Sequence, residues 1–206
     1  MRVPVLMFDF GNVLGFFDYS TVFHRFGLKL GLSAEQFEAM MYERGAARLG
    51  LEFERGRLTA EEFARQVTEL AGLEMSFEEF AVHWPDIFTL NEPVARLAAA
   101  LKQRGYTLLL GSNTNVLHAR FYRRRFEEAL APFDHFVFSY EIGELKPAAA
   151  FFKTCLDLVG APPGKSSVGS SFSRVQAWTM HMVEAVREGE GSLGIRKTSC
   201  LVSSLV

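Results

Sequence analysis

Residues 3–14 have the sequence VPVLMFDFGNVL, in which an almost continuous apolar run ends at Asp9 and is followed by Gly11 and Asn12. A short apolar run that stops at Gly and Asn is typical of a strand buried on both faces of a sheet. Asp9 is therefore expected at the carboxyl end of the first strand.

Two similar apolar runs follow later in the chain, at residues 106–110 and 135–139. Residues 116–130 lie between them and are long enough, and polar enough on one side, to form a helix. A further helix is expected over residues 92–104, with Pro93 in its first turn. Strands that alternate with helices predict an α/β fold with a parallel sheet and right-handed connections.

The segment between the first two strands has a different pattern, which predicts helices joined by short loops. Three capping boxes occur within about 50 residues, each with a hydroxyl at the N-cap and Glu or Gln three positions later. They are Ser33 with Gln36, Thr59 with Glu62, and Ser76 with Glu79. Residues 16–89 are therefore expected to form an inserted helical cap, and residues 1–15 and 90–206 the core domain.

Composition limits the class of protein. The chain has 206 residues, is 49% hydrophobic and carries a formal net charge of −2. This charge argues against a nucleic-acid-coating surface, and no run approaches the about 18 apolar residues of a membrane span. Cys155 and Cys200 cannot form a disulfide scaffold, so a cytoplasmic location is expected. The first nine residues do not resemble a signal peptide.

Three polar groups follow predicted strands, and their chemistry suits phosphoryl transfer. Asp9 can act as a nucleophile or a metal ligand. Ser112, in the cluster Ser-Asn-Thr-Asn at 112–115, can hold phosphate oxygens, and Lys146 can neutralise their charge. Because the carboxyl ends of parallel strands meet at one edge of the sheet, Asp9 and Ser112 are expected to lie together there.

These residues carry a resemblance to a known family. The stretches FDFGNVL (8–14), LGSNTN (110–115) and Lys146-Pro147 resemble motifs I, II and III of the haloacid dehalogenase-like (HAD) superfamily. The segment FERGRLTAEEF (53–63) is similar to part of the helical type-1 cap of its sugar-phosphate phosphatases. Motifs I and II most resemble the bacterial α-D-glucose-1-phosphate phosphatase branch. The resemblance implies a Rossmann-like parallel sheet flanked by helices, with an inserted helical-bundle cap.

The resemblance also implies roles for individual residues. Asp9 would attack phosphorus and form an aspartyl-phosphate, and Lys146 would neutralise charge on Asp9 and the phosphate. Ser112 and Asn113 would bind the phosphoryl group. Mg²⁺ would be held by Asp9 and the backbone carbonyl of Gly11. The expected function is thus magnesium-dependent hydrolysis of a small phosphorylated metabolite, with a sugar phosphate as the expected substrate and no nucleic-acid or membrane partner.

Two positions differ from the family pattern. Gly11 stands where most family phosphatases have an acid that protonates the leaving group. No Asp or Glu occurs from 158 to 183, where the family places its motif IV carboxylates, and residues 166–206 are rich in serine. We therefore expect 166–206 to be an atypical continuation of the core. The alternative functions are a degenerate member that binds phosphorylated ligands without turnover and, less favoured, a 2-haloacid dehalogenase.

Overall fold

A sheet of three parallel strands forms the centre of the fold in the computed structural model, which describes residues 5–160. The strands are β1 (Val5–Phe8), β4 (Thr107–Ser112) and β5 (His135–Phe138), in the order β1-β4-β5. Phe8 is opposite Leu110 and Ser112 is opposite Phe138, so all three strands end at the same edge. The α/β fold class predicted from the sequence is confirmed.

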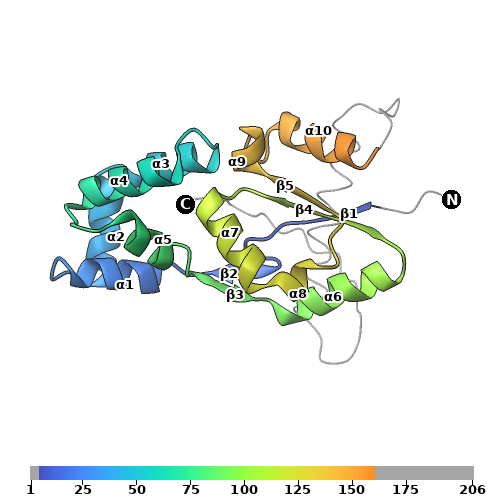
Figure 1. Ribbon diagram of the computed structural model, residues 1–206, viewed down its shortest axis with the longest axis horizontal. Coiled ribbons are helices and arrows are strands. Elements are labelled where there is room, and N and C mark those ends of the chain that lie inside the picture. Colours follow the sequence, from blue (N-terminus) through green and yellow to red (C-terminus); the bar gives the residue numbers. More distant parts are fainter. Residues whose placement is uncertain (1–4, 161–206) are drawn as a thin grey trace.

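Helices cover both faces of this sheet (Figure 1). One face packs on α6 (Glu92–Gln103), α7 (Val116–Arg125) and α8 (Glu127–Leu130), and the other on α10 (Ala149–Leu158). Leu108 and Leu110 belong to the first hydrophobic cluster and Leu109 to the second, as the two-residue period of a strand requires. β4 is therefore buried on both sides, which explains its continuous apolar sequence.

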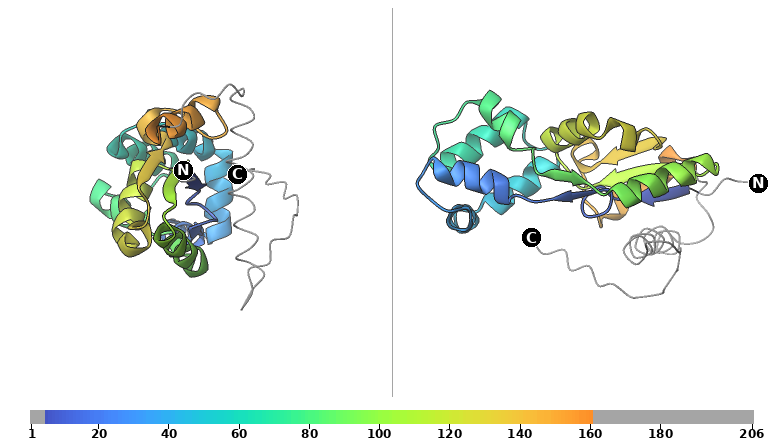
Figure 2. Two further views of the ribbon diagram at one scale, coloured as in Figure 1. Left: turned by 90° about the vertical axis from the view of Figure 1, so that its right-hand side faces the viewer. Right: turned by 90° about the horizontal axis from the view of Figure 1, so that it is seen from below.

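A two-stranded ribbon connects the sheet to a helical unit. Its strands are β2 (Gly15–Phe17) and β3 (Phe88–Leu90), which pair antiparallel with Phe17 opposite Phe88. The domain boundaries expected at 15/16 and 89/90 fall within this ribbon. The helical unit lies beside the sheet region, as the view from below shows (Figure 2).

Five helices between β2 and β3 pack around a second hydrophobic cluster, to which Leu117 of α7 also contributes. They are α1 (Ser20–Leu28), α2 (Ala34–Glu43), α3 (Ala46–Glu54), α4 (Ala60–Ala71) and α5 (Phe77–His83). Phenylalanines fill much of this cluster, and the rings of Phe53 and Phe63 stack 4.1 Å apart. We call this five-helix unit the cap.

Two of the three predicted capping boxes form completely. The hydroxyls of Ser33 and Thr59 each accept a hydrogen bond from the backbone N–H three residues on, and the side-chain oxygens of Gln36 and Glu62 each accept one from the N-cap N–H. At Ser76 the hydroxyl accepts from the backbone N–H of Glu79, but the bond from Ser76 N–H to the Glu79 side chain is not formed. The caps explain why α2, α4 and α5 begin where the sequence predicted.

Two predicted elements differ in detail. The helix expected over 116–130 is interrupted at Phe126, whose φ of −121° is not helical. This break directs the Phe126 ring to the main core, where it stacks at 6.3 Å from Phe10. The last residue of the strand expected over 135–139, Ser139, begins the short helix α9 (Ser139–Ile142) instead.

Predictions that concern residues 161–206 lie outside the described residues. They include the atypical segment 166–206 and the position of the motif IV carboxylates. Within residues 5–160, each helix is too short or too polar to cross a lipid bilayer.

Removing the Thr59 hydroxyl tests whether the N-cap stabilises the helical unit. Thr59→Ala is expected to lower the free energy of unfolding by about 1 kcal/mol, because the amide of Glu62 loses its acceptor. Urea denaturation followed by circular dichroism measures this change. Thr59→Ser keeps the hydroxyl and is the control, and equal loss in both variants contradicts the capping interpretation.

Candidate active site

An ion pair between Asp9 and Lys146 lies at the carboxyl edge of the sheet. Lys146 Nζ is 2.5 Å from Asp9 Oδ2 and donates a second bond to the carbonyl of Gly111 at 2.9 Å. The Lys146 side chain is 16% exposed and that of Asp9 34%. The ammonium is thus largely enclosed, while the carboxylate stays accessible to a molecule in solution.

Asn113 fixes the backbone of Lys146. Its Oδ1 accepts from Lys146 N at 2.7 Å, and its Nδ2 donates to the Lys146 carbonyl at 3.1 Å. Both ends of this amide therefore bind the lysine backbone, so the loop after β4 determines where the ammonium lies. The phosphate-binding role of Asn113 stays a prediction.

Ser112 is the last residue of β4 and is buried, with its hydroxyl donating to the Asn113 carbonyl at 3.3 Å. The next turn is held by Ser139, whose hydroxyl accepts from Thr114 N and donates to the Thr114 carbonyl. Ser139 is fully buried. This reciprocal pair ties the loop after β4 to the end of β5. Sequence reasoning missed Ser139, because it was assigned to the end of a strand.

The turn after Asp9 brings Gly11 to the same edge. Asn12 has a φ of 56°, in the left-handed region that Asn tolerates, and the chain bends back so that Gly15 N donates to the Phe10 carbonyl at 2.8 Å. A Cβ on residue 11 would lie 3.4 Å from Cε1 of Phe17. The aromatic ring of Phe17 therefore borders the space where a side chain at position 11 would begin.

The two residues predicted as metal ligands supply hard oxygen donors. A carboxylate and a backbone carbonyl suit Mg²⁺, which keeps several waters and takes further oxygens from a substrate phosphate. Residues 5–160 contain no group of three or more His, Cys, Asp or Glu side chains arranged to hold a metal. The donor set of Asp9 and Gly11 thus fits magnesium better than a nitrogen- and sulfur-liganded metal.

The cap brings Glu54 into electrostatic range of Lys146. Glu54 ends α3 and is half-buried. Burial raises the pKa of its carboxyl, and the Lys146 ammonium opposes this rise. Tyr19, which precedes α1, has a phenol whose pKa is raised by burial and then by the Glu54 charge. Glu54 is therefore within electrostatic range of Lys146 and Tyr19.

Glu54 was not among the predicted site residues. The signal was present, because residues 53–63 match a family cap segment, but a sequence does not show which side chain of a cap faces the sheet. Phe17 and Tyr19 were likewise not among the predicted site residues.

His118 is buried at the start of α7 and has a structural role. Asn115 Oδ1 accepts from His118 N, and Asn115 Nδ2 lies 3.0 Å from the ring Nδ1. The amide nitrogen can only donate, so Nδ1 is the acceptor and the imidazole is neutral. Burial lowers the pKa of His118 to about 3, consistent with this assignment.

Comparison with known proteins now identifies the family. The chain is 30% identical over 154 residues to a D-ribitol-5-phosphate phosphatase from Bacteroides thetaiotaomicron, a match covering 71% of this chain and 72% of the relative. No family model matches the chain. A HAD family enzyme from the same species, solved with magnesium and inorganic phosphate, superposes with a TM-score of 0.65 at 22% identity, over 86% of this chain and 91% of that chain.

The chain belongs to the HAD-like hydrolase family. A HAD-like family hydrolase from Porphyromonas gingivalis has the same fold, with a TM-score of 0.63 at 20% identity over 87% of this chain and 89% of that one. These structural likenesses establish the HAD fold. The narrower resemblance to α-D-glucose-1-phosphate phosphatases stays a prediction.

The neutral state of His118 predicts a pH dependence of stability in this HAD protein. The unfolded chain binds a proton on this histidine below about pH 6.5, whereas the folded chain does so only near pH 3. Stability from this group is therefore present above pH 6.5 and is lost as the pH falls. From pH 7 to pH 5, the loss in unfolding free energy is about 2 kcal/mol.

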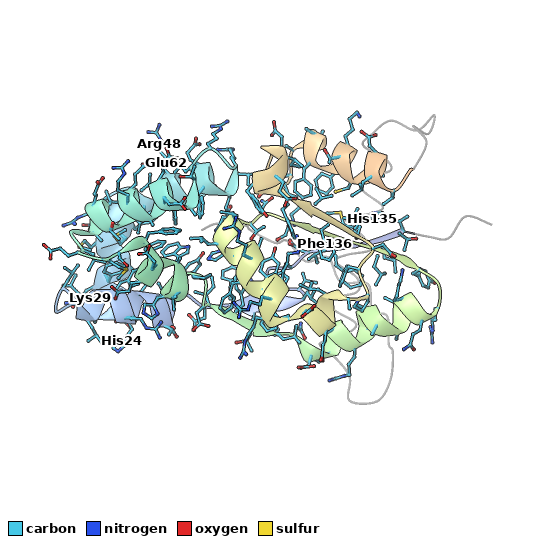
Figure 3. All side chains as sticks on the ribbon, viewed as in Figure 1. His24, Lys29, Arg48, Glu62, His135 and Phe136 are labelled. Atoms are coloured by element: carbon cyan, nitrogen blue, oxygen red, sulfur yellow. The ribbon has the colours of Figure 1, made fainter. Side chains whose placement is uncertain are left out.

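Urea denaturation at several pH values measures this effect. His118→Gln is expected to be less stable at pH 7 but to lose less stability on acidification than the wild type. The control is His24→Gln, because His24 is exposed on α1 at the edge of the cap (Figure 3). An unchanged pH slope in His118→Gln contradicts the assignment.

Proposed function

We propose that this protein is a magnesium-dependent phosphomonoesterase that hydrolyses a small sugar or polyol phosphate through an aspartyl-phosphate on Asp9. The observation that carries the proposal is the ion pair of Asp9 and Lys146 at the carboxyl edge of the sheet. A phosphatase relative at 30% identity supports the reaction class. That relative acts on ribitol 5-phosphate by name, which favours a phosphorylated polyol or sugar here.

The geometry explains how Asp9 can attack phosphorus. The amide of Phe10 donates to Asp9 Oδ1 at 2.7 Å, and Lys146 holds Oδ2. One oxygen is thus bound by the backbone, and the other faces the ammonium that would also contact a phosphate. A carboxylate held in one orientation loses little freedom on reaching the transition state. Lys146 offsets the repulsion between the carboxylate and the incoming phosphate dianion.

Magnesium would supply further charge neutralisation on the phosphoryl oxygens when bound. Asp9 and the Gly11 carbonyl would hold it, together with water and substrate oxygens. Two related HAD structures from Bacteroides thetaiotaomicron contain magnesium with inorganic phosphate. The buried hydroxyl of Ser112, at the end of β4, is the proposed phosphate contact.

A panel of sugar and polyol phosphates, assayed for phosphate release with and without Mg²⁺, tests the proposal. The wild type is expected to release phosphate only with Mg²⁺. Asp9→Asn is expected to abolish turnover, because an amide does not attack phosphorus. Asp18→Asn, on an exposed carboxylate that caps Ser20, is the matched control and should keep full activity.

Other outcomes of this assay favour the alternatives. Wild-type protein that binds the phosphates without hydrolysing them contradicts the enzyme proposal and supports a degenerate binding protein. Metal-independent release of chloride from a 2-haloacid supports a dehalogenase, which uses the same aspartate nucleophile.

Asn113→Ala tests whether activity depends on the position that Asn113 gives to the Lys146 ammonium. The variant keeps Asp9 and Lys146 but removes both bonds that hold the lysine backbone. A displacement of about 1 Å can lower a rate about 10²-fold, so kcat/KM is expected to fall by about that factor. Asn91→Ala, which removes an amide bonded to Val13 near the ribbon, is the comparison variant. Equal activity of Asn113→Ala and wild type contradicts the positioning role.

A further inference from the structure

Hydrolysis of an alkyl phosphate requires a proton for the leaving oxygen, and the turn after Asp9 does not supply one. Gly11 has no side chain, and Phe17 borders the space beside it. The Phe17 ring is 44% exposed and makes an edge contact with Tyr19, with centroids 6.2 Å apart. Phe17 therefore borders the space beside Gly11 without offering a proton, and the raised pKa of the Tyr19 phenol makes it a poor donor, so the proton has to come from another residue.

The chain just after α3 contacts α9, the short helix that precedes Lys146 in the sequence. A Cβ on Gly56 would lie 2.1 Å from the carbonyl oxygen of Tyr140 in α9, so the two backbones touch. Gly56 has a φ of 67°, which favours glycine at this contact. Figure 1 shows α3 ending next to α9. Glu54 precedes Gly56 by two residues, so this contact holds it near α9 and within electrostatic range of Lys146.

The charges around this contact leave Glu54 available. Arg55 and Arg57 both bind Glu52, at 3.3 Å and 3.0 Å. Within residues 5–160, Glu54 forms no hydrogen bond or ion pair, although the charge of Lys146 acts to lower the pKa of its carboxyl. The arginines stabilise the loop by binding the neighbouring glutamate, while the Glu54 carboxyl remains free to exchange a proton.

We infer that Glu54, carried by the cap, is the general acid and base of the reaction, in place of a carboxyl at position 11. This inference rests on the proposed phosphatase function. As the Asp9–phosphorus bond forms and the bond to the leaving oxygen breaks, the Glu54 carboxyl gives its proton to that oxygen, and the alcohol departs. Water then attacks phosphorus, the Asp9–phosphorus bond breaks, and the Glu54 carboxylate takes the water proton. Phosphate is released, and Asp9 and Glu54 return to their starting states.

The protonation of Glu54 is consistent with this role. Burial raises the pKa of its carboxyl, which keeps part of the population protonated nearer neutral pH than an exposed glutamate. The Lys146 ammonium opposes the rise, whereas the nearby Tyr19 phenol has a raised pKa and is neutral. A bound phosphate dianion would add negative charge and raise the pKa further.

The test compares substrates with different leaving groups. Glu54→Gln is expected to lower kcat/KM by about 10²–10⁴-fold on the best alkyl phosphate of the panel. On p-nitrophenyl phosphate the expected loss is less than about tenfold, because nitrophenolate departs without a proton. Glu61→Gln, on an exposed glutamate of α4, is the control and should match the wild type on both substrates. Thermal melting verifies that each variant is folded.

Equal losses on the two substrates, or no loss on either, overturn the inference. If Glu54→Gln does not fold, Glu54→Asp keeps a shortened carboxyl and should show the same preference, with a smaller loss on the alkyl phosphate. An inactive wild type refutes the proposed function and the inference together. An active wild type, an inactive Asp9→Asn and an unaffected Glu54→Gln refute the inference alone.

Discussion

The ion pair between Asp9 and Lys146 depends on four separate segments being placed correctly. β1 delivers the carboxylate, β4 supplies the Gly111 carbonyl, and the loop after β4 binds the lysine backbone through Asn113. Ser139 then ties that loop to the end of β5. The parallel register of the three strands aligns these contributions at one edge. A shift in either strand pairing would separate the carboxylate from its cation.

The sheet region and the cap make different contributions to the surroundings of this ion pair. The sheet region holds the lysine almost out of solvent, so its charge is weakly screened toward the carboxylate. The cap brings Glu54 into electrostatic range of Lys146, and Phe17 of the ribbon borders the space beside Gly11. The groups proposed to bind a phosphoryl unit are thus fixed by the sheet region, whereas Glu54 belongs to the cap, which is built around a separate hydrophobic cluster that Leu117 of α7 also joins.

Local signals in the sequence were sufficient for most of the fold. Apolar runs marked β1, β4 and β5, and N-cap hydroxyls marked the starts of α2, α4 and α5. The break at Phe126 was not predictable, because it arises from a distant contact with Phe10. The short ribbon was missed as well, since three-residue strands carry too little periodicity to recognise.

The residues of the candidate site also divide into those marked by local sequence signals and those placed by contacts between distant segments. Asp9, Ser112 and Lys146 follow or end regular elements, so their approximate meeting place follows from the sheet topology. Glu54 and Ser139 act through contacts between segments far apart in the chain, and no local pattern marks those contacts. Both ends of the Asn113 amide bind the Lys146 backbone, a contact that sequence reasoning did not predict, and its phosphate-binding role stays a prediction.

The hydrogen-bonded ribbon of β2 and β3 has an evolutionary consequence. Because these strands are neighbours, the polypeptide leaves the sheet and returns to it at adjacent points, with Phe17 opposite Phe88. A helical insert of a different size or sequence can therefore replace the present one without altering the order of the central strands. Selection can recombine a conserved reaction centre with new recognition modules, and substrate range can diverge while the chemistry is inherited intact.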